Sequence, residues 1–349
     1  MNDLLIKPKD SIKNALKKIT KTSQKCLMVV DEENCLIGTL SEGDIRKAIL
    51  SRVDIRSSIN NYYNEKPTFF YENQYSDKQI EKIFLKEKFD LIPIVDQKKV
   101  VKNYLTWNNI FTKNEKIKTE SINIPVVIMA GGKGTRLQPF TKVLPKPLIP
   151  IKDKSIIEII IGEFQKSGCD HFHMTLNYKS EIIKAYFNQL NSTFKVDFID
   201  EKKPLGTAGS LKLLSGTLNE PFFVTNCDII AKINYAKLFD FHRKNDFDIT
   251  LVASAKEYEI PYGTCELNNH GYLSAINEKP KYNLLINTGL YVINPDILDL
   301  IPDNNIFHMT HLIQKAKDLQ KKVGVFPIDD ESWIDIGQWS EYHRVLDQL

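Results

Sequence analysis

The chain has 349 residues, 42% of them hydrophobic, and its 47 basic side chains nearly balance 44 acidic ones, which leaves a formal net charge of +3. This length predicts two or three domains, and the charge balance argues against a general nucleic-acid or membrane surface, so any anion site must be local. No apolar run approaches the roughly 20 residues that span a bilayer, and residues 1–10 lack an apolar signal-peptide core, so we expect a cytoplasmic protein.

An internal repeat occupies the first third of the chain. A shift of 65 residues superposes "CLMVVDEENCLIGTLSEGDI" (26–45) on "LIPIVDQKKVVKNYLTWNNI" (91–110), and the helical patterns that begin at Ser11 and Ser76 also coincide. Each copy predicts a helix, an apolar strand ending in aspartate, a turn, a second strand and a Ser or Thr that opens another helix. We therefore predict a tandem α+β pair at 1–115, with units at about 1–60 and 61–115, followed by a charged linker at 116–123.

The pattern changes after the linker. Short apolar strands are predicted at "IPVVIMA", "FHMTLN", "KVDFID", "FFVTN" and "DITLVAS", with amphipathic helices between them, for example over 156–164 and 182–187. This alternation predicts a Rossmann-like α/β domain over 124–349. Its mostly parallel sheet should have helices on both faces and ligands at the carboxyl ends of its strands.

A glycine-rich segment, "MAGGKGTRLQPFTKVLPKPLIPI" (129–151), includes the end of the first of these strands. It is neither a Walker A loop, because Lys133 is followed by glycine, nor a dinucleotide fingerprint, because position 137 is leucine. Its glycines let backbone N–H groups approach an oxyanion, and Arg136 adds a permanent planar cation. Prolines on both sides of Lys146 hold its ammonium on a stiff segment near the same loop. The segment predicts a site that holds a phosphate while it reacts.

The same segment resembles the signature of sugar-1-phosphate nucleotidyltransferases, and the similarity extends over residues 122 to about 345. This resemblance implies catalytic roles for Arg136, Lys146 and Asp228, the last in "FFVTNCD". It also implies a Mg²⁺ ion held by Asp228 and by Asp335 of "WIDIG", a pair that suits a hard octahedral cation bound to nucleotide phosphates. The implied nucleotide-binding residues lie in the glycine loop and in "EKKPLGTAGS" (201–210): Ala130, Gly131, Gly132, Gly134, Thr135, Glu201, Leu205, Gly206, Thr207 and Ala208.

Three further segments resemble the sugar-phosphate pocket of this family. They are "PYGTCEL", "EKP" and "NTGLY", which supply Gly263, Glu278, Lys279, Asn287 and Thr288. Glu278 would accept hydrogen bonds from sugar hydroxyls, and Lys279 would hold the sugar's phosphate. Because a sugar-1-phosphate is already an ionised nucleophile, the reaction needs positioning and charge neutralisation, without a histidine or serine relay.

The base is predicted from Glu201, which precedes Gly206 by five positions. Guanine presents adjacent N–H and NH₂ donors that a carboxylate can accept together, whereas thymine and uracil present one N–H between acceptors. "PLGTAG" also resembles guanylyltransferases that act on mannose-1-phosphate. GTP is therefore the predicted nucleotide. The alternative reactions are thymidylyl and uridylyl transfer. The alternative role for Glu201 is that it only ends a strand in solvent and does not bind the base.

The N-terminal repeat resembles a pair of CBS (cystathionine-β-synthase-type) units. Ser41 and Asp44 in "GTLSEGDI" match the family's Ser/Thr-x-x-Asp pattern, which binds the ribose of an adenine nucleotide. The second unit has Thr106 and Asn109, and so lacks the carboxylate. The resemblance implies either nucleotide sensing or a scaffold for a homo-oligomer.

A CBS pair ahead of a guanylyltransferase-like domain resembles the enzymes that act on glucosamine-1-phosphate in bacterial legionaminic acid synthesis. That likeness rests on the order of the domains. It does not rest on any residue that would recognise the sugar. A non-catalytic nucleotide sensor is the competing hypothesis, and the intact cationic and metal-binding side chains argue against it.

Cysteine and histidine patterns predict no further site. The cysteines are odd in number, widely spaced and without a CxxC pair, which argues against a disulfide framework and a zinc site. We expect them to be reduced and mostly buried; they are Cys26, Cys35, Cys169, Cys227 and Cys265. The seven histidines show no metal-ligand spacing, and we assign His171 and His173 no role.

Overall fold

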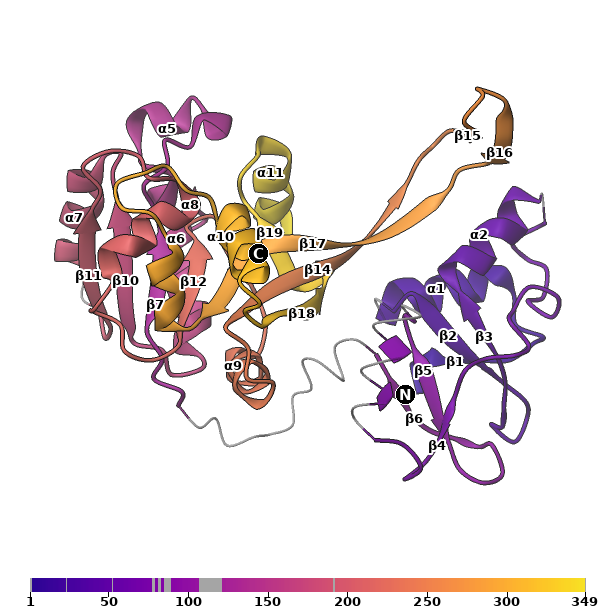
Figure 1. Ribbon diagram of the computed structural model, residues 1–349. Helices are drawn as coiled ribbons and strands as arrows, with labels where there is room; N and C mark the ends of the chain where they lie inside the picture. Colours follow the sequence, from indigo (N-terminus) through magenta and orange to yellow (C-terminus); the bar gives the residue numbers. More distant parts are fainter. Residues whose placement is uncertain are drawn as a thin grey trace. The chain divides into compact units, whose positions relative to one another are not determined.

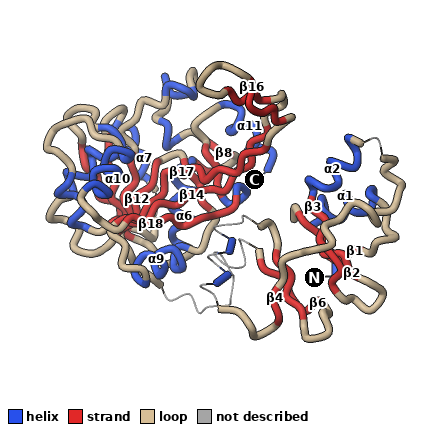
Figure 2. Tube along the Cα trace, turned by 45° about the vertical axis from the view of Figure 1, so that its right-hand side comes forward, coloured by secondary structure: helices blue, strands red, loops and turns tan. Residues whose placement is uncertain are grey.

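Two compact units, Met1–Lys113 and Asn114–Leu349, make up the chain in a computed structural model (Figure 1, Figure 2). The structure describes residues 2–22, 24–51, 53–76, 79–80, 83–84, 89–106, 121–190 and 192–348. Asn109 and linker positions 116–120 lie outside the described residues. Within the described segments, no helix combines the length and the apolar character needed to cross a membrane.

The N-terminal unit contains two three-stranded sheets, with strand orders β1-β2-β3 and β4-β5-β6. In each sheet the first strand runs parallel to the second, and the second is antiparallel to the third. The described elements are η1 (Asn2–Leu4), β1 (Leu5–Ile6), α1 (Ile12–Thr22), β2 (Cys26–Val30), β3 (Leu36–Ser41), α2 (Glu42–Leu50), β4 (Phe70–Tyr71), β5 (Ile92–Val95) and β6 (Val101–Leu105).

The strand registers reproduce the 65-residue repeat. Leu27 pairs with Leu40 in the first hairpin, and Ile92 pairs with Leu105 in the second, 65 positions later on both strands. Each hairpin also has its register shift one step before the end of its first strand. The repeat is therefore a repeat of backbone geometry as well as of residue type.

An aspartate closes the first strand of each hairpin. Asp31 Oδ1 accepts hydrogen bonds from two turn amides at 2.8 and 2.9 Å, and Asp96 Oδ1 accepts the two equivalent bonds at 2.9 Å. Such carboxylate-to-backbone bonds fix a tight turn. The two turns meet at a bridge between Cys35 and Val100. The apolar core of this unit draws on both halves, because it also includes Leu91, Val95 and Val101.

The C-terminal unit is built on a seven-stranded sheet of order β11-β10-β7-β12-β17-β14-β18. These strands are β7 (Val126–Met129), β10 (His171–Leu176), β11 (Lys195–Asp200), β12 (Phe222–Asn226), β14 (Ile249–Glu259), β17 (Lys281–Ile293) and β18 (Val323–Asp329). Three two-stranded sheets pair β8 (Pro150–Ile151) with β9 (Lys154–Ser155), β13 (Ile229–Ala231) with β19 (Trp333–Asp335), and β15 (Thr264–Leu267) with β16 (Leu273–Asn277).

Helices connect these strands. The α-helices are α5 (Phe140–Val143), α6 (Ile156–Gln165), α7 (Ser180–Gln189), α8 (Gly206–Gly209), α9 (Tyr235–Lys244), α10 (Met309–Asp318) and α11 (Trp339–Gln348). The 3₁₀ helices are η2 (Thr135–Leu137), η3 (Lys146–Leu148), η4 (Ser210–Leu214), η5 (Pro295–Leu300) and η6 (Asp330–Ser332). The five strands predicted from the sequence and both example helices are present.

The central sheet is mostly parallel, as predicted. Neighbours from β11 to β12 are parallel, β14 and β18 are parallel, and only β17 runs against both of its neighbours. The chain runs outward from β7 to β10 and β11, then returns to place β12 on the other side of β7. An open α/β sheet binds its ligands at such a reversal, beyond the carboxyl ends of the strands.

Helices cover both faces of this sheet. The helix predicted over 156–164 is α6, in which positions 156, 157, 160, 161 and 164 are buried, and a capping box between Ser155 and Glu158 fixes where the helix begins. On that face, the ring of Phe164 in α6 contacts Phe223 of β12 and Tyr235 of α9. The opposite face packs against η4, η5 and α10.

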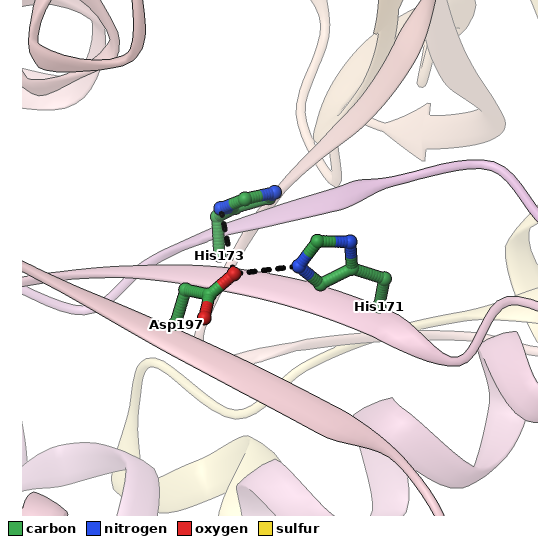
Figure 3. Close-up of side chains that lie close together, drawn as sticks. All are labelled: His171, His173 and Asp197. Atoms are coloured by element: carbon green, nitrogen blue, oxygen red, sulfur yellow. Dashed lines mark hydrogen bonds and ion pairs between the residues drawn. The ribbon is translucent and has the colours of Figure 1, made fainter. Parts of the chain in front are cut away.

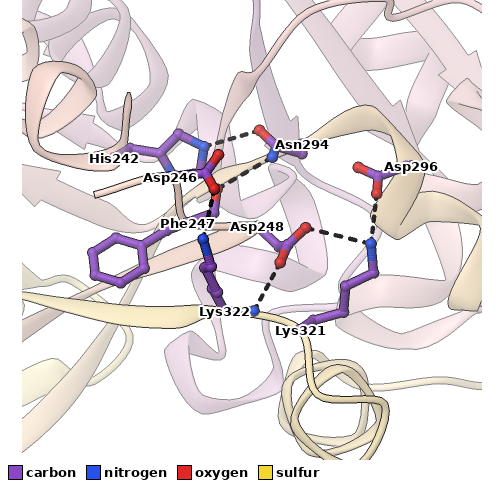
Figure 4. A network of polar contacts seen from close by, with 8 residues as sticks. All are labelled: His242, Asp246, Phe247, Asp248, Asn294, Asp296, Lys321 and Lys322. Carbon is purple, nitrogen blue, oxygen red and sulfur yellow. Dashed lines mark hydrogen bonds and ion pairs between the residues drawn. The ribbon is translucent and has the colours of Figure 1, made fainter. Parts of the chain in front are cut away.

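A polar network joins the amino ends of β14 and β18 (Figure 4). His242 of α9 bonds to Asn294 at 3.0 Å, and burial lowers the pKa of this histidine. Asp248 accepts a hydrogen bond from the Lys322 amide at 2.7 Å and lies 3.4 Å from Lys321 Nζ. These contacts anchor the two strands at the start of β14.

β14 and β17 continue past the sheet as a two-stranded ribbon that carries β15 and β16 at its far end (Figure 1). Ala255 is the last residue of β14 that pairs with β18, so beyond it β14 pairs only with β17. We call residues 256–284 the arm. Its exposed large apolar side chains are Tyr258, Tyr262, Leu267, Tyr272, Leu273, Ile276, Tyr282 and Leu284.

The predicted burial of most cysteines is confirmed, and two of the histidines lie beside an aspartate. All five cysteines are free, and Cys26, Cys169 and Cys227 are buried. His171 and His173, to which we assign no role from the sequence, lie with Asp197 so that the ligand atoms of the three side chains fall within 4.8 Å of one another. The third member comes from a neighbouring strand, which a search along the sequence does not connect to the first two.

Candidate active site

A cavity of about 390 Å³ lies beyond the carboxyl ends of β7, β11 and β12, where the sheet topology predicts a ligand site. The predicted catalytic side chains Arg136, Lys146 and Asp228 all line it. The predicted nucleotide-binding residues that line it are Gly131, Gly132, Gly134, Thr135, Glu201, Leu205, Gly206 and Thr207. Three separate stretches of sequence thus converge on one cavity.

The glycine loop turns sharply enough to lie against the Lys146 segment. Gly134 has φ +63°, and a Cβ at this position would lie 2.8 Å from Thr141 Cγ2 and 3.1 Å from Lys146 Cβ. Both the left-handed backbone and the close packing require glycine. Thr141 Oγ1 also donates a 2.9 Å hydrogen bond to the Gly134 carbonyl. The loop and the proline-flanked lysine therefore form one packed unit.

Lys146 and Asp228, which both line this cavity, form a buried ion pair. The two residues are 9% and 7% exposed, although 82 positions separate them in the sequence. A buried pair of this kind has a desolvation cost that its mutual attraction offsets only with good geometry. A buried ion pair in the lining of a cavity is typical of a functional site.

Asp335 and Arg136 complete the charged group around Gly337. A Cβ at Gly337 would lie 2.7 Å from Asp335 Oδ1, 3.2 Å from Asp228 Oδ2 and 3.3 Å from Arg136 Nη2, so the three side chains surround this glycine. Burial, followed by the charge of Asp228, raises the pKa of Asp335, while the Gly337 amide and the two nearby cations act in the opposite direction. β13 and β19 bring the two aspartates together, because Ile229 pairs with Asp335.

The donor set fits a hard divalent cation. Asp228 is buried and Asp335 is half-buried, and burial first and the charge of Asp228 second raise the pKa of Asp335. A cation between them would relieve that repulsion, and Mg²⁺ commonly binds one or two carboxylates together with substrate phosphates. Lys146 is the positive charge that compensates Asp228 in the structure itself.

Glu201 lies against the glycine loop at the end of β11. It is 8% exposed, its Oε2 accepts a 3.2 Å hydrogen bond from the Leu205 amide, and a Cβ at Gly131 would lie 2.5 Å from its Oε1. Burial raises the pKa of this carboxyl, and the Leu205 hydrogen bond opposes the shift. A buried carboxylate that faces a cavity can accept hydrogen bonds from paired donors on a ligand.

Two predicted nucleotide-binding residues lie behind the cavity wall. Ala130 and Ala208 are 1% and 0% exposed, and neither lines the cavity. Their amides bond to the carbonyls of Thr175 and Phe307. Both residues shape the backbone of the wall.

Six lining residues were not among the predicted site residues: Met129, Pro204, Ser210, Asn226, Cys227 and Gly337. Asn226 and Cys227 directly precede Asp228, so the end of a predicted parallel strand was the signal that could have found them. Gly337 lies in the quoted "WIDIG" segment, but only the contact distances reveal why a glycine is needed there.

The predicted sugar-phosphate residues are divided between the arm and its base, and none lines the cavity. Gly263, Glu278 and Lys279 are exposed on the arm, where a Cβ at Gly263 would lie 3.1 Å from Glu278 Oε2. Asn287 and Thr288 lie in β17 at the base. The Asn287 amide donates to the Tyr291 hydroxyl at 2.8 Å, and Thr288 Oγ1 donates to the Val252 carbonyl at 2.8 Å.

In the N-terminal unit, Ser41 and Asp44 form the capping box of α2. The Asp44 amide donates to Ser41 Oγ at 3.1 Å, and Asp44 Oδ2 accepts from the Ser41 amide at 2.9 Å and from Ser41 Oγ at 2.7 Å. The Ser-x-x-Asp pattern thus has a local structural role of its own. Thr106 is 6% exposed, at the end of the described part of the second unit.

Comparison with protein families gives two matches. The family described as nucleotidyl transferase matches residues 125–349, and the CBS domain family matches residues 2–51. The first match contains every residue that lines the cavity.

Individual relatives match the same C-terminal region. Mannose-1-phosphate guanyltransferase 2 of Candida glabrata is 33% identical over 229 residues, which is 62% of this chain and 62% of the relative. D-glycero-alpha-D-manno-heptose 1-phosphate guanylyltransferase of Campylobacter jejuni is 31% identical over 222 residues, which is 63% of this chain and 97% of the relative. The match thus spans about three fifths of the yeast protein and nearly all of the bacterial one.

Solved structures share the fold of the C-terminal unit. HddC from Yersinia pseudotuberculosis is 26% identical, has a TM-score of 0.51, and matches 64% of this chain and 99% of its own length. A putative glucose-1-phosphate thymidylyltransferase from Bacillus anthracis, 18% identical with a TM-score of 0.51, matches 64% of this chain and 94% of its own. At 18% identity, the second match shows a shared fold and says nothing about function.

Proposed function

The chain belongs to the nucleotidyl transferase family, and on that premise we propose that its C-terminal unit transfers a nucleotidyl group from a nucleoside triphosphate to a sugar-1-phosphate. The observation that carries this proposal is the cavity in which the glycine loop, Arg136 and the Lys146–Asp228 pair converge. Cationic groups for phosphates and the Asp228 carboxylate line the cavity, and Asp335, the second carboxylate for a metal ion, lies next to it around Gly337.

The proposed chemistry is an in-line displacement at phosphorus. An oxygen of the sugar's phosphate forms a bond to the α-phosphorus of the nucleotide, and the bond from that phosphorus to the bridging oxygen breaks, so pyrophosphate leaves with the electron pair. No proton needs to be removed, because the attacking phosphate is ionised near pH 7. The enzyme's task is to orient the two phosphates and neutralise their charge.

Arg136 and Lys146 perform that task in the proposal. Arg136 is exposed to the cavity and can hold phosphoryl oxygens with its planar fork. Lys146 is buried and preorganised by Asp228, so its charge needs little rearrangement when the transition state forms. Asp228 and Asp335 would hold Mg²⁺, which supplies charge neutralisation at the phosphates when bound.

GTP is the proposed nucleotide. Glu201 is a buried carboxylate at the cavity wall, and guanine offers it two adjacent donors. The Candida glabrata and Campylobacter jejuni relatives are both named as guanylyl-transferring enzymes, which supports this choice. Thymidylyl or uridylyl transfer is the alternative.

For the sugar, we propose glucosamine-1-phosphate, with a role in bacterial surface-glycan or legionaminic acid synthesis. The support is the order of the two domains, with a CBS match ahead of the nucleotidyl transferase match. Mannose-1-phosphate and heptose-1-phosphate are the alternatives, since they appear in the names of the relatives.

One experiment tests the activity, the base and the sugar together. The purified chain is incubated with Mg²⁺, each of GTP, dTTP, UTP, CTP and ATP, and each of the glucosamine-, mannose-, heptose- and glucose-1-phosphates, and pyrophosphate release is followed. We expect release with GTP and glucosamine-1-phosphate above all other pairs. If no pair releases pyrophosphate while GTP still binds, the non-catalytic sensor replaces the enzyme.

For the N-terminal unit, we propose an adenine-nucleotide site at Ser41, Asp44 and Thr106. The capping box complicates the obvious test, because Asp44→Ala also removes the N3 side chain that accepts the hydrogen bond from the amide of the N-cap residue Ser41. The chain offers a matched control in Ser155 and Glu158, which form the same capping box on α6.

The test compares Asp44→Ala with Glu158→Ala in thermal melts of the full chain, with and without AMP. Both variants should melt earlier than the wild type, but only Asp44→Ala should lose the AMP-dependent rise in melting temperature. If AMP stabilises neither the wild type nor the Glu158 variant, the unit is a scaffold, and its deletion should then change the size of the predicted homo-oligomer.

A further inference from the structure

His171, His173 and Asp197 form a cluster on one face of the sheet (Figure 3). Alternation along β10 puts the two histidines on the same face, and Asp197 of β11 is the register partner of His173. Asp197 Oδ2 lies 2.6 Å from His171 Nε2 and 3.8 Å from His173 Nδ1. Two imidazole nitrogens therefore converge on one carboxylate oxygen.

We propose that these three side chains bind a divalent transition-metal ion, of which Zn²⁺ is the best suited. Two histidines and a carboxylate are a common set of three protein ligands for zinc, with a fourth position left for water. Ligand atoms around a tetrahedral zinc lie about 3.4 Å apart, given bond lengths of about 2.0–2.2 Å. The observed separations of 2.6 and 3.8 Å bracket that value, so small side-chain rotations suffice.

The position already attracts a positive charge. Lys195 Nζ lies 2.9 Å from Asp197 Oδ2 and 3.4 Å from His171 Nε2, so an ammonium group contacts two of the three proposed ligand atoms. The Lys195 side chain is 66% exposed and can turn into solvent when a metal ion takes its place. Lys195 is therefore a competitor of the metal, and its removal should strengthen binding.

The site is separate from the cavity. His171 is the first residue of β10 and Asp197 is in the first half of β11, whereas the cavity lies beyond the carboxyl ends of these strands. A metal ion here would join β11, the edge strand of the sheet, to its neighbour. Glu201 follows β11 directly, so the ion would also steady the strand that delivers this carboxylate. The proposal does not depend on nucleotidyl transfer.

The test uses the full chain after treatment with a chelator, in buffer with excess Mg²⁺ to occupy the carboxylates of the cavity. Zn²⁺ is titrated calorimetrically, and Co²⁺ is titrated while its visible absorption is followed. We expect one site in the wild type. His171→Ala should weaken it by at least the 10- to 100-fold that loss of an outer-shell partner costs. His270→Ala, an exposed histidine on the arm, should leave it unchanged.

Lys195→Gln gives a result that a nonspecific histidine site would not give, because it should tighten Zn²⁺ binding at neutral pH. His171 is partly exposed, so its replacement is not expected to disturb folding, unlike that of His173, which is 4% exposed. Equal Zn²⁺ affinity in the wild type and in folded His171→Ala would overturn the proposal. An unchanged affinity in Lys195→Gln would show that the ion binds elsewhere.

Discussion

The cavity and the arm both contain predicted site residues, but the fold fixes them to different degrees. Lys146 and Asp228 in the cavity are buried and paired, Lys146 in η3 and Asp228 in the turn between β12 and β13. Glu278 and Lys279 on the arm are exposed on a ribbon in which β14 and β17 pair only with each other. The nucleotide half of the proposed site is thus preformed, whereas the sugar half lies on an extension of the sheet.

The exposed apolar side chains of the arm also indicate that the fold fixes the arm less firmly than the cavity. A two-stranded ribbon is only marginally stable by itself in water, yet this one exposes large apolar side chains such as Tyr262, Tyr272 and Ile276, which are 74%, 72% and 64% exposed. The order of Glu278 and Lys279 therefore depends on what the arm contacts, while the order of the cavity depends on the sheet. Substitutions in the two regions should have different kinetic effects.

The largest effect is expected in the cavity. Lys146→Ala or Asp228→Asn removes one member of a preorganised charge pair, and losing one such contact should reduce kcat by about 10²- to 10³-fold. Pyrophosphate release at saturating substrates measures this effect. Lys154→Ala, an exposed lysine close by in the sequence, is the control and should turn over normally. Near-normal turnover in a folded Lys146 or Asp228 variant would remove both residues from the mechanism.

On the arm, Lys279→Ala should act mainly on the sugar substrate. Loss of a charged hydrogen bond to phosphate costs about 1.5–3 kcal/mol, or roughly 10- to 150-fold in kcat/KM for the sugar-1-phosphate, and the KM for the nucleotide should stay the same. Glu266→Gln, exposed near the tip, is the matched control. An equal loss for both substrates would mean that the arm supports the whole cavity.

Mixing two variants with reduced activity tests whether the arm and the cavity that it serves belong to the same chain. If the arm serves the cavity of its own chain, a mixture of Asp228→Asn and Lys279→Ala chains should have no more activity than the two separate proteins. A recovery of activity on mixing would mean that the arm of one copy completes the cavity of another, as a homo-oligomer would allow.

The sequence was sufficient to locate the cavity, although not all of its lining residues, because the segments that form it follow recognisable strands. The glycine loop follows a predictable strand, and parallel strands present Glu201 and Asp228 at the same edge of the sheet. The arm was not predictable, because β15 and β16 look like any short hairpin, and nothing in their pattern says that β14 leaves its neighbour β18 after Ala255. The Asp197 cluster was missed for a related reason, since it depends on the register between two strands.

A smaller effect is expected on base selection. Glu201→Gln replaces a pure acceptor with a group that both donates and accepts, so one of guanine's donors loses its partner. The mismatch should cost at least about 1 kcal/mol, which is about fivefold in the ratio of kcat/KM for GTP over UTP. Competition between the two nucleotides measures this ratio directly. A ratio equal to that of the wild type would assign Glu201 to the fold alone.

The smallest effect concerns the free energy of unfolding, which the buried carboxylate of Glu201 is expected to lower at neutral pH. Burial raises the pKa of Glu201, so the folded state favours the protonated carboxyl more than the unfolded state does. The stabilising contribution of this group is therefore complete below its unfolded pKa and is lost as pH rises through the folded pKa. At neutral pH the buried carboxylate opposes folding, and Glu201→Gln should melt at a higher temperature than the wild type.

Thermal melts at several pH values test whether Glu201→Gln raises the melting temperature. The advantage of Glu201→Gln should be largest at pH 7–8 and should shrink as the wild-type carboxyl becomes protonated in acid. Glu266→Gln, the same substitution at an exposed position of the arm, is the control for the change of side chain itself. A Glu201→Gln variant that melts earlier at neutral pH would mean that the contacts of the carboxylate, including the Leu205 amide, outweigh the cost of its burial. The cavity would then be stabilised by the same residue that is proposed to select the base.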